Sequence, residues 1–293
     1  MARIILIETS TALCSTALAE DGKIVAYRES TTPRAQASLT APFVKEMLDE
    51  RGLRVSDCDA VCVSKGPGSY TGLRVGVSTA KGLCFGAGLP LIAVGTLDTL
   101  VFQAAAEGLL PEGCRYVVPM VDARRMEVYT AVFTPDGRQL TDTRPQVVES
   151  LDQAISDKPL VPAGCTEAGS AAYAGETPGN DRCTEAGSAA CTGETSGNDL
   201  CTEAGSAACT GGPVTFAGLL AEGPVLFIGD GADKCRETLA HPNAHFAQCC
   251  PKASAMLLPS GAAFEAGRFE NTAYFEPFYL KEFIATVPRN KIF

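Results

Sequence analysis

The sequence predicts an α/β protein built from two duplicated lobes, each with a mixed sheet flanked by helices. Three observations support this class. Short β-branched runs alternate with segments of helical periodicity, an acidic residue follows the first strand of each half, and a glycine turn follows a later strand of each half. We divide the chain into an amino-terminal lobe at residues 1–108 and a carboxy-terminal lobe at 109–293.

The chain opens as a β-meander of three strands. Ile4 to Ile7 is a β-branched run, and residues 14–20 alternate between polar and apolar. Asp21-Gly22 predicts a two-residue turn into a third strand at 24–28. This arrangement places Glu8 directly after the first strand.

A helix is predicted between Pro33 and Gly52, because apolar residues recur there every four positions on one face. Gly52 provides the carboxy-terminal stop. The apolar stripe consists of Leu39, Phe43 and Met47. Such a stripe fits a buried core face or a contact surface.

The segment from Ala60 to Gly88 joins a buried strand, a glycine turn and a helix. Gly66-Pro67-Gly68 turns the chain, and Ser69 or Thr71 can cap the helix that follows. Small residues then recur every four positions: Gly72, Gly76 and Ala80. Because a glycine inside a helix costs roughly 0.5 to 1 kcal/mol, we expect these residues to let another backbone approach closely.

A strand at 91–94 and a helix at 96–108 complete the first half, and the pattern then restarts. Strands at 117–121 and 128–133 repeat the meander, with Asp122 after the first of them. Residues 225–231 repeat the strand and glycine turn, and a helix can start at Ala232.

The two halves fall into register when one tract is removed. Glu8 precedes Gly66 by 58 positions, and Asp122 precedes Gly229 by 107, which becomes 59 without the 48 residues of 165–212. In that tract an 18-residue unit starts at positions 165, 183 and 201. The unit has almost no large side chain to bury, so we interpret the tract as a low-complexity insertion in the second lobe.

Composition limits the function classes. The formal net charge of −10 opposes a polyanion and disfavours tight direct binding of nucleic acid. No apolar run approaches the roughly 18 residues of a membrane span, and the first strand is too short for a signal peptide, so we expect a cytoplasmic protein. The 13 cysteines form no Cys-x-x-Cys pair, which favours reduced, packed thiols over a disulfide framework or a zinc site.

Three motifs carry a family resemblance. They are IILIETSTALCSTAL at 4–18, SKGPGSYTGLRVG at 64–76 and DARRMEVY at 122–129. In order and spacing they resemble the TsaB family, also called YeaZ, and the resemblance returns at 227–231 and 276–280. It implies an actin-like, ribonuclease H-like fold in each lobe, shared with sugar kinases and heat-shock chaperones (the ASKHA superfamily).

The resemblance also implies a function. TsaB proteins help to make threonylcarbamoyladenosine in transfer RNA and are not themselves catalytic. They dock on the related transferase TsaD through helices of the amino-terminal lobe, the ATPase TsaE joins them, and TsaC supplies threonylcarbamoyl-adenylate. Alone, family members often form homodimers through the same surface. By this resemblance we expect a non-catalytic subunit that docks on TsaD and activates it.

The expected docking surface combines the striped helix with the glycine-containing helix, edged by two cations. Its residues are Leu39, Phe43, Met47, Gly72, Leu73, Arg74, Gly76, Ala80 and Lys81. On this hypothesis Gly76→Leu prevents docking and leaves the fold intact.

The two halves are expected to face each other across a cleft that could hold ATP or ADP with Mg²⁺ in a weak or vestigial nucleotide site. Its candidate residues are Glu8, Thr9, Ser10, Gly66, Gly68, Ser69, Asp122, Gly229 and Gly231. The N–H groups of Gly68 and Ser69 at a helix start could bind phosphate, and the two carboxylates could hold the metal through water. The alternative is that the turns are kept for shape, because Pro67 removes a donor and the run fails G-x-G-x-x-G.

An O-sialoglycoprotein endopeptidase-like metallopeptidase of the M22 type is the alternative function, and a small-molecule kinase is a third. The catalytic relatives carry a His-x-x-x-His pair where this chain has Gln36. The only histidines, His241 and His245, have Pro242 between them, which argues against a helical metal pair. We expect no catalytic and no metal-binding residue.

Overall fold

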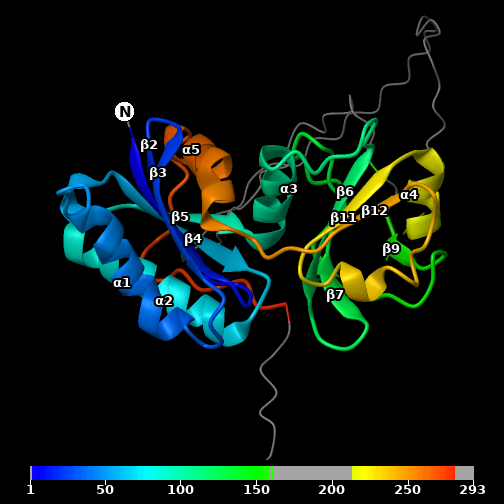
Figure 1. Cartoon of the computed structure of the whole chain (residues 1–293), viewed down its shortest axis with the longest axis horizontal. Helices are drawn as coiled ribbons and strands as arrows, with labels where there is room; N and C mark the ends of the chain where they lie inside the picture. The colour runs from blue at the N-terminus through cyan, green and yellow to red at the C-terminus, as the bar shows by residue number, and fades with distance from the viewer. Residues whose placement is uncertain (1, 159, 161–212, 281–293) are drawn as a thin grey trace, which may run out of the picture.

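The computed structural model describes residues 2–158, 160 and 213–280. The repeat tract at 165–212 lies outside the described residues. Two five-stranded sheets form two lobes that lie side by side (Figure 1). No helix among the described residues has the length and hydropathy to cross a membrane.

The first sheet has the strand order β3-β2-β1-β4-β5. The predicted meander is formed by β1 (Arg3–Glu8), β2 (Cys14–Glu20) and β3 (Lys23–Ser30), which pair antiparallel. β4 (Ala60–Gly66) and β5 (Leu91–Gly95) run parallel to β1. Asp21 and Gly22 have φ angles of 51° and 74°, as the two-residue turn requires.

The second sheet repeats this topology with the order β12-β11-β6-β7-β8. Its meander is β6 (Tyr116–Asp122), β7 (Glu127–Thr130) and β8 (Arg144–Val147), and β11 (Val225–Ile228) and β12 (Ala244–Ala247) are parallel to β6. Each strand takes the place of its counterpart in the first sheet. The predicted class, two duplicated α/β lobes, is therefore confirmed.

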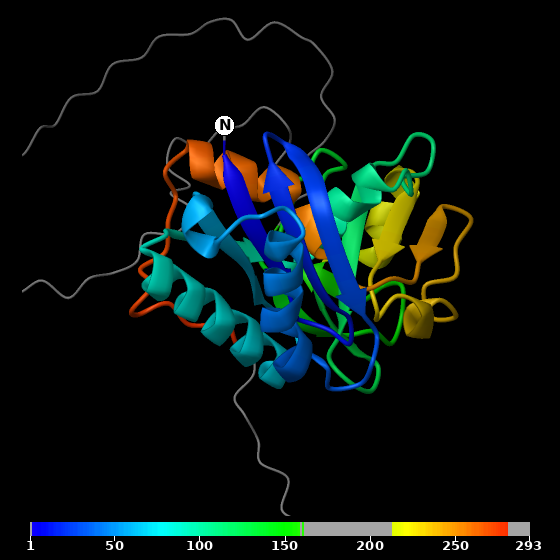
Figure 2. The ribbon, with the colours of Figure 1, turned by 60° about the vertical axis from the view of Figure 1, so that its left-hand side comes forward.

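Two helices cover one face of the first sheet, α1 (Gln36–Asp49) and α2 (Tyr70–Ala87). Figure 2 shows them next to each other on this face. Inward residues of β1 and β4, such as Ile5 and Val63, pack with Leu48 of α1 and Val77 of α2. The Ser69 hydroxyl caps α2 by accepting a hydrogen bond from Gly72 N at 3.3 Å, and Gly88 ends the helix with a φ of 69°.

The other faces are covered by helices that cross between the lobes. α3 (Thr96–Ala106) follows the last strand of the first sheet, yet its apolar residues pack into the core of the second, with Val117, Phe133 and Ile228. The 3₁₀ turn η3 (Ala253–Met256) and α5 (Leu257–Glu265) follow the last strand of the second sheet and pack against β1, β2 and β5 of the first. The division at 108/109 stays a prediction about the chain, but packing crosses it in both directions.

The second lobe departs from strict duplication in two places. After β11 the chain forms only a 3₁₀ turn, η2 (Asp233–Cys235), where the sequence predicted that a helix could start. The insertion is bracketed by β9 (Ala154–Ser156) and β10 (Val214–Thr215), which pair antiparallel and lead into α4 (Phe216–Glu222). Because these strands hold the chain ends on either side together, the insertion need not disturb the lobe.

The small residues of α2 face inward, which corrects the predicted docking surface. An added Cβ on Gly72 would overlap the Thr9 carbonyl oxygen, and one on Gly76 would overlap the Thr9 hydroxyl. The glycines do admit a close backbone, as predicted, but that backbone belongs to the turn after β1 of the same chain. Leu73, Ala80 and Met47 are also buried, so none of these five can contact a partner.

The inward position of Gly76 predicts that Gly76→Leu destabilises the fold. The larger side chain meets Thr9 and Val63 in a closed space, and we expect a loss of about 3 kcal/mol or more in the free energy of unfolding, measured in urea. Gly82, on the solvent side of the same helix, has open space around its Cβ position, so Gly82→Leu is the matched control and should unfold like the parent. Equal stability of the two variants would contradict this packing.

Candidate functional site

The two turns of the first lobe are closed on each other. Ser69 N donates to the Ser10 carbonyl at 2.6 Å, and the Thr9 hydroxyl donates to the Gly72 carbonyl at 2.8 Å. A Cβ on Gly68 would overlap the Ser10 carbonyl. The structure thus brings Thr9, Ser10, Gly68 and Ser69 together, but the Ser69 N–H predicted to bind phosphate is already used within the chain.

Glu8 is fully buried between these turns. Ser10 N donates to Glu8 Oε1 at 2.7 Å, while Oε2 has no hydrogen-bond partner. Burial raises the pKa of the Glu8 carboxyl from an ordinary 4.5 to about 7, against the opposing effect of the hydrogen bonds from Ser10. The carboxyl is therefore partly protonated near neutral pH, and it is shielded from solvent.

The turns of the second lobe are joined in the same way. Gly231 N donates to the Met120 carbonyl at 2.9 Å, and Asp122 N donates to Asp230 Oδ1 at 2.8 Å. A Cβ on Gly229 would overlap the Met120 carbonyl, which explains the glycine at a φ of 135°. Burial raises the pKa of the Asp230 carboxyl.

Asp122 is the exposed carboxylate of this second pair of turns, and a cation of the same chain occupies it. Lys234 forms an ion pair with Asp122 Oδ1 and donates to the Glu127 carbonyl at 2.7 Å. The ammonium thus neutralises the carboxylate that was predicted to hold Mg²⁺ through water. Of the two readings of the turns, these contacts favour turns kept for shape.

The described part of the chain offers no cluster of side chains suited to hold a metal ion. No three His, Cys, Asp or Glu side chains come together there in a group that could hold a metal. Gln36, at the start of α1, donates to the Thr11 carbonyl at 3.0 Å. His241 accepts a hydrogen bond from Asn243 N in a turn, and His245 lies on β12, so the two do not share a helix face.

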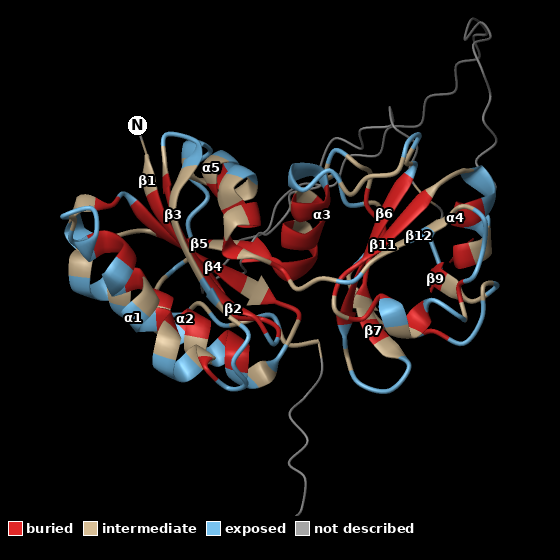
Figure 3. Ribbon diagram, viewed as in Figure 1, coloured by how far each residue is buried: buried red, intermediate tan, exposed pale blue. Residues whose placement is uncertain are grey.

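The exposed face of α1 and α2 differs from the predicted surface. On α2 the outward residues are Thr71, Arg74, Ser78, Gly82, Phe85 and Gly86, and on α1 they include Ala37, Ala41 and Lys45. Figure 3 shows buried and exposed stripes alternating along both helices. Of the predicted interface residues, Arg74 is exposed and Leu39, Phe43 and Lys81 are half-buried.

Sequence reasoning missed Phe85, whose side chain is 90% exposed at the end of α2. It also missed the small outward residues Ser78 and Gly82. The available signal was helical spacing: positions 78 and 82 recur every four residues as regularly as 72 and 76 do. Nothing in that spacing states which of the two small stripes faces the sheet.

The carboxy-terminal strap, which we define as residues 266–280, explains the half-buried state of Lys81. Lys81 Nζ donates to the carbonyls of Ala273 and Phe275, each at 3.1 Å. Phe275 packs into the core under α2, and Phe278 N donates to the Lys65 carbonyl at 2.7 Å. Lys81 therefore holds the strap along α2 and is not a free cation for a partner.

Known proteins share both the sequence and the fold. The family model of TsaD, tRNA N6-adenosine threonylcarbamoyltransferase, matches residues 30–285. The tRNA threonylcarbamoyladenosine biosynthesis protein TsaB of Escherichia coli is 39% identical over 161 residues, which span 53% of this chain and 68% of that protein. The chain belongs to the TsaB family.

A second relative matches over a shorter part of its length, whereas a solved structure matches along its whole chain. TsaB of Bacillus subtilis is 34% identical over 130 residues, 44% of this chain and 54% of the relative. The structure of YeaZ from Pseudomonas aeruginosa has a TM-score of 0.63 at 21% identity and covers 96% of this chain and 100% of its own. The two-lobed fold of this TsaB-family protein is thus that of a solved YeaZ.

The buried Glu8 predicts a pH-dependent stability. Its pKa is higher in the folded than in the unfolded chain, so the folded state holds the proton more tightly and stability falls as the pH rises from about 4.5 to about 7. The full difference is roughly 3 kcal/mol. Glu8→Gln cannot ionise and should lose this decline, so it should gain stability over the parent above pH 7.

The measurement is the free energy of unfolding in urea across this pH range for both proteins. Glu20, which is paired with Arg3 at the surface, provides the control variant Glu20→Gln. The control should keep the decline of the parent between pH 4.5 and 7. Parallel pH profiles for the parent and Glu8→Gln would contradict the burial of an ionisable Glu8.

Proposed function

We propose that this TsaB-family protein is a non-catalytic subunit of the machinery that makes threonylcarbamoyladenosine in transfer RNA, and that it docks on the transferase TsaD. The observation that carries the proposal is membership in the TsaB family together with closed turns in both lobes. A protein whose Ser69 N–H and exposed Asp122 are engaged within its own chain is suited to a supporting role.

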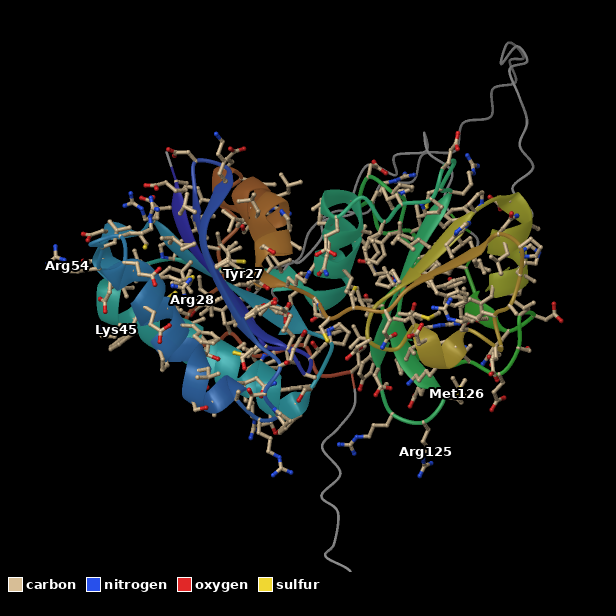
Figure 4. All side chains as sticks on the ribbon, in the orientation of Figure 1. Tyr27, Arg28, Lys45, Arg54, Arg125 and Met126 are labelled. Carbon is tan, nitrogen blue, oxygen red and sulfur yellow. The ribbon has the colours of Figure 1, made fainter. Side chains whose placement is uncertain are left out.

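The docking surface in this proposal is the exposed face of α1 and α2. On α2 the residues Ser78, Gly82 and Gly86 form a smooth stripe that lets the backbone of a partner helix approach, and Phe85 offers an exposed aromatic anchor at its end. Lys45 of α1 lies on the outer side of the same lobe (Figure 4). TsaD, whose family model matches residues 30–285 and so includes both helices, is the proposed occupant of this face.

Docking would act on TsaD by selecting a conformation. A partner that binds one state of an enzyme more tightly than the others raises the population of that state by mass action. The bound subunit needs no reacting group of its own for this effect. In the proposal TsaE joins the pair, and TsaC supplies the activated threonylcarbamoyl group to TsaD.

Depletion of this protein is expected to remove threonylcarbamoyladenosine from total transfer RNA, measured by nucleoside mass spectrometry. A plasmid copy should restore the modification, and so should a copy that lacks residues 165–212, because the paired strands β9 and β10 hold the ends of the insertion together. Modification that persists undiminished after depletion would overturn the proposed function.

Gly82→Leu is expected to weaken binding of TsaD without loss of stability. A Cβ added to Gly82, on the exposed face of α2, meets nothing within 4 Å, so the larger side chain should obstruct a partner helix without disturbing the core. We expect a loss of at least tenfold in affinity, about 1.4 kcal/mol, by isothermal titration calorimetry with TsaD from the same organism. Gly261→Ala, on the distant helix α5 and with open space at its Cβ position, is the control. Equal affinities of parent and Gly82→Leu would exclude this face.

A further inference from the structure

Arg74 is held in place by an aromatic platform that links α2 to the carboxy-terminal strap. Its guanidinium lies 4.4 Å from the centroid of the Tyr70 ring. The Tyr70 ring in turn contacts the ring of Tyr279, with centroids 4.8 Å apart and an angle of 40° between the planes. The exposed arginine therefore has fewer conformations to lose on binding than a free surface side chain would have.

The charge on α2 is one-sided. The helix contains no aspartate or glutamate from Tyr70 to Ala87, although the protein as a whole has a net charge of −10. Its two cations are Arg74 and Lys81, and Lys81 donates to two carbonyls of the strap. Among the described residues no carboxylate forms an ion pair with Arg74, so this guanidinium remains the free positive charge of the helix face.

We infer that Arg74, positioned by Tyr70 and Tyr279, is the polar anchor of the docking face and binds a carboxylate on the docked transferase subunit. The inference rests on the proposed function. Charge complementarity favours a carboxylate, because α2 presents this planar donor on its outward side and contains no carboxylate of its own. Guanidinium binds carboxylate through two parallel hydrogen bonds, which lysine cannot reproduce.

The position of Arg74 strengthens this choice of occupant. It lies near the amino-terminal end of α2, where the helix dipole favours negative charge. The neighbouring outward residues Ser78 and Gly82 favour the close approach of a protein helix, whereas the overall negative charge opposes a nucleic acid. Tyr279 is a positioning residue in this scheme, since it acts on the partner through Tyr70 and Arg74.

The test compares the affinity of variants for TsaD from the same organism, by calorimetry at low and at high ionic strength. Arg74→Ala should bind about tenfold or more weakly, with a smaller salt dependence than the parent. Arg74→Lys keeps the charge but should still lose most of the affinity that Arg74→Ala loses. Tyr279→Leu should bind TsaD a fewfold more weakly than the parent. Tyr279→Phe keeps the ring and should bind like the parent. Thermal unfolding of each variant verifies that it folds.

Arg125→Ala is the charge-matched control. Figure 4 shows Arg125 on the second lobe, in the turn between β6 and β7, and its side chain forms no ion pair with the described residues. Its affinity should remain within twofold of the parent. A loss of affinity in Arg74→Lys would show that charge alone is not enough, because lysine keeps the positive charge but cannot form the two parallel hydrogen bonds.

The outcomes separate the inference from the proposed function. A parent protein that does not bind TsaD contradicts both. Parent binding that survives Arg74→Ala, or that Arg74→Lys preserves in full, overturns the role of Arg74 alone. If Arg74→Ala dissociates a homodimer, measured by light scattering, and leaves TsaD binding unchanged, the carboxylate belongs to a second copy of this chain and the inference is wrong.

Discussion

The structure depends on an exchange of helices between its lobes. α3 leaves the first sheet and fills the core of the second, while η3 and α5 leave the second sheet and cover the first. Three polar contacts help to hold the crossing segment. Lys252 N donates to Gln103 of α3, Lys252 Nζ pairs with Glu107 at the end of that helix, and Ala253 N donates to Ser15 of β2. Because each core is completed by a helix from the other half, neither lobe buries its apolar surface without its neighbour. The relative position of the lobes is therefore part of the fold.

The same close packing explains why the paired turns are closed. Thr9 lies against the glycines of α2, and Met120, near the end of β6, lies against the glycine turn after β11. In each lobe the end of the first strand thus contacts the glycine turn that follows a later parallel strand. A phosphate group needs free N–H donors at such turns, but Ser69 N and Gly231 N already donate within the chain. The glycines that suggest a phosphate site in the sequence serve here to join the strands of one lobe.

The sequence predicts the topology well, because the topology is repeated. The meander, the glycine turns and the spacing from Glu8 to Gly66 and from Asp122 to Gly229 are properties of chain order, which a single sequence records. Chain order does not record which side of a helix packs against the sheet. Gly72 and Gly76 alternate with Ser78 and Gly82 around α2, and only contact with Thr9 decides which stripe is internal. Lys81 was misplaced for a related reason: its partners Ala273 and Phe275 lie far along the chain and offer backbone carbonyls, which carry no signal in sequence.

These contacts also connect the outward face of α2 to other parts of the first lobe. The outward face of α2 is connected to the turn after β1 through Gly72 and Thr9, and to the strap through Lys81 and Tyr70. The strap in turn reaches the glycine turn through Phe278 and Lys65. A protein docked on this face would therefore press on a helix that is fixed on its inner side and along its edge. Because the helix is held on two sides, it cannot simply tilt and presents a rigid surface. Any structural adjustment on binding would then take place in the partner. In the proposed role of a docking subunit, that rigidity is the property through which the protein would select one state of the transferase.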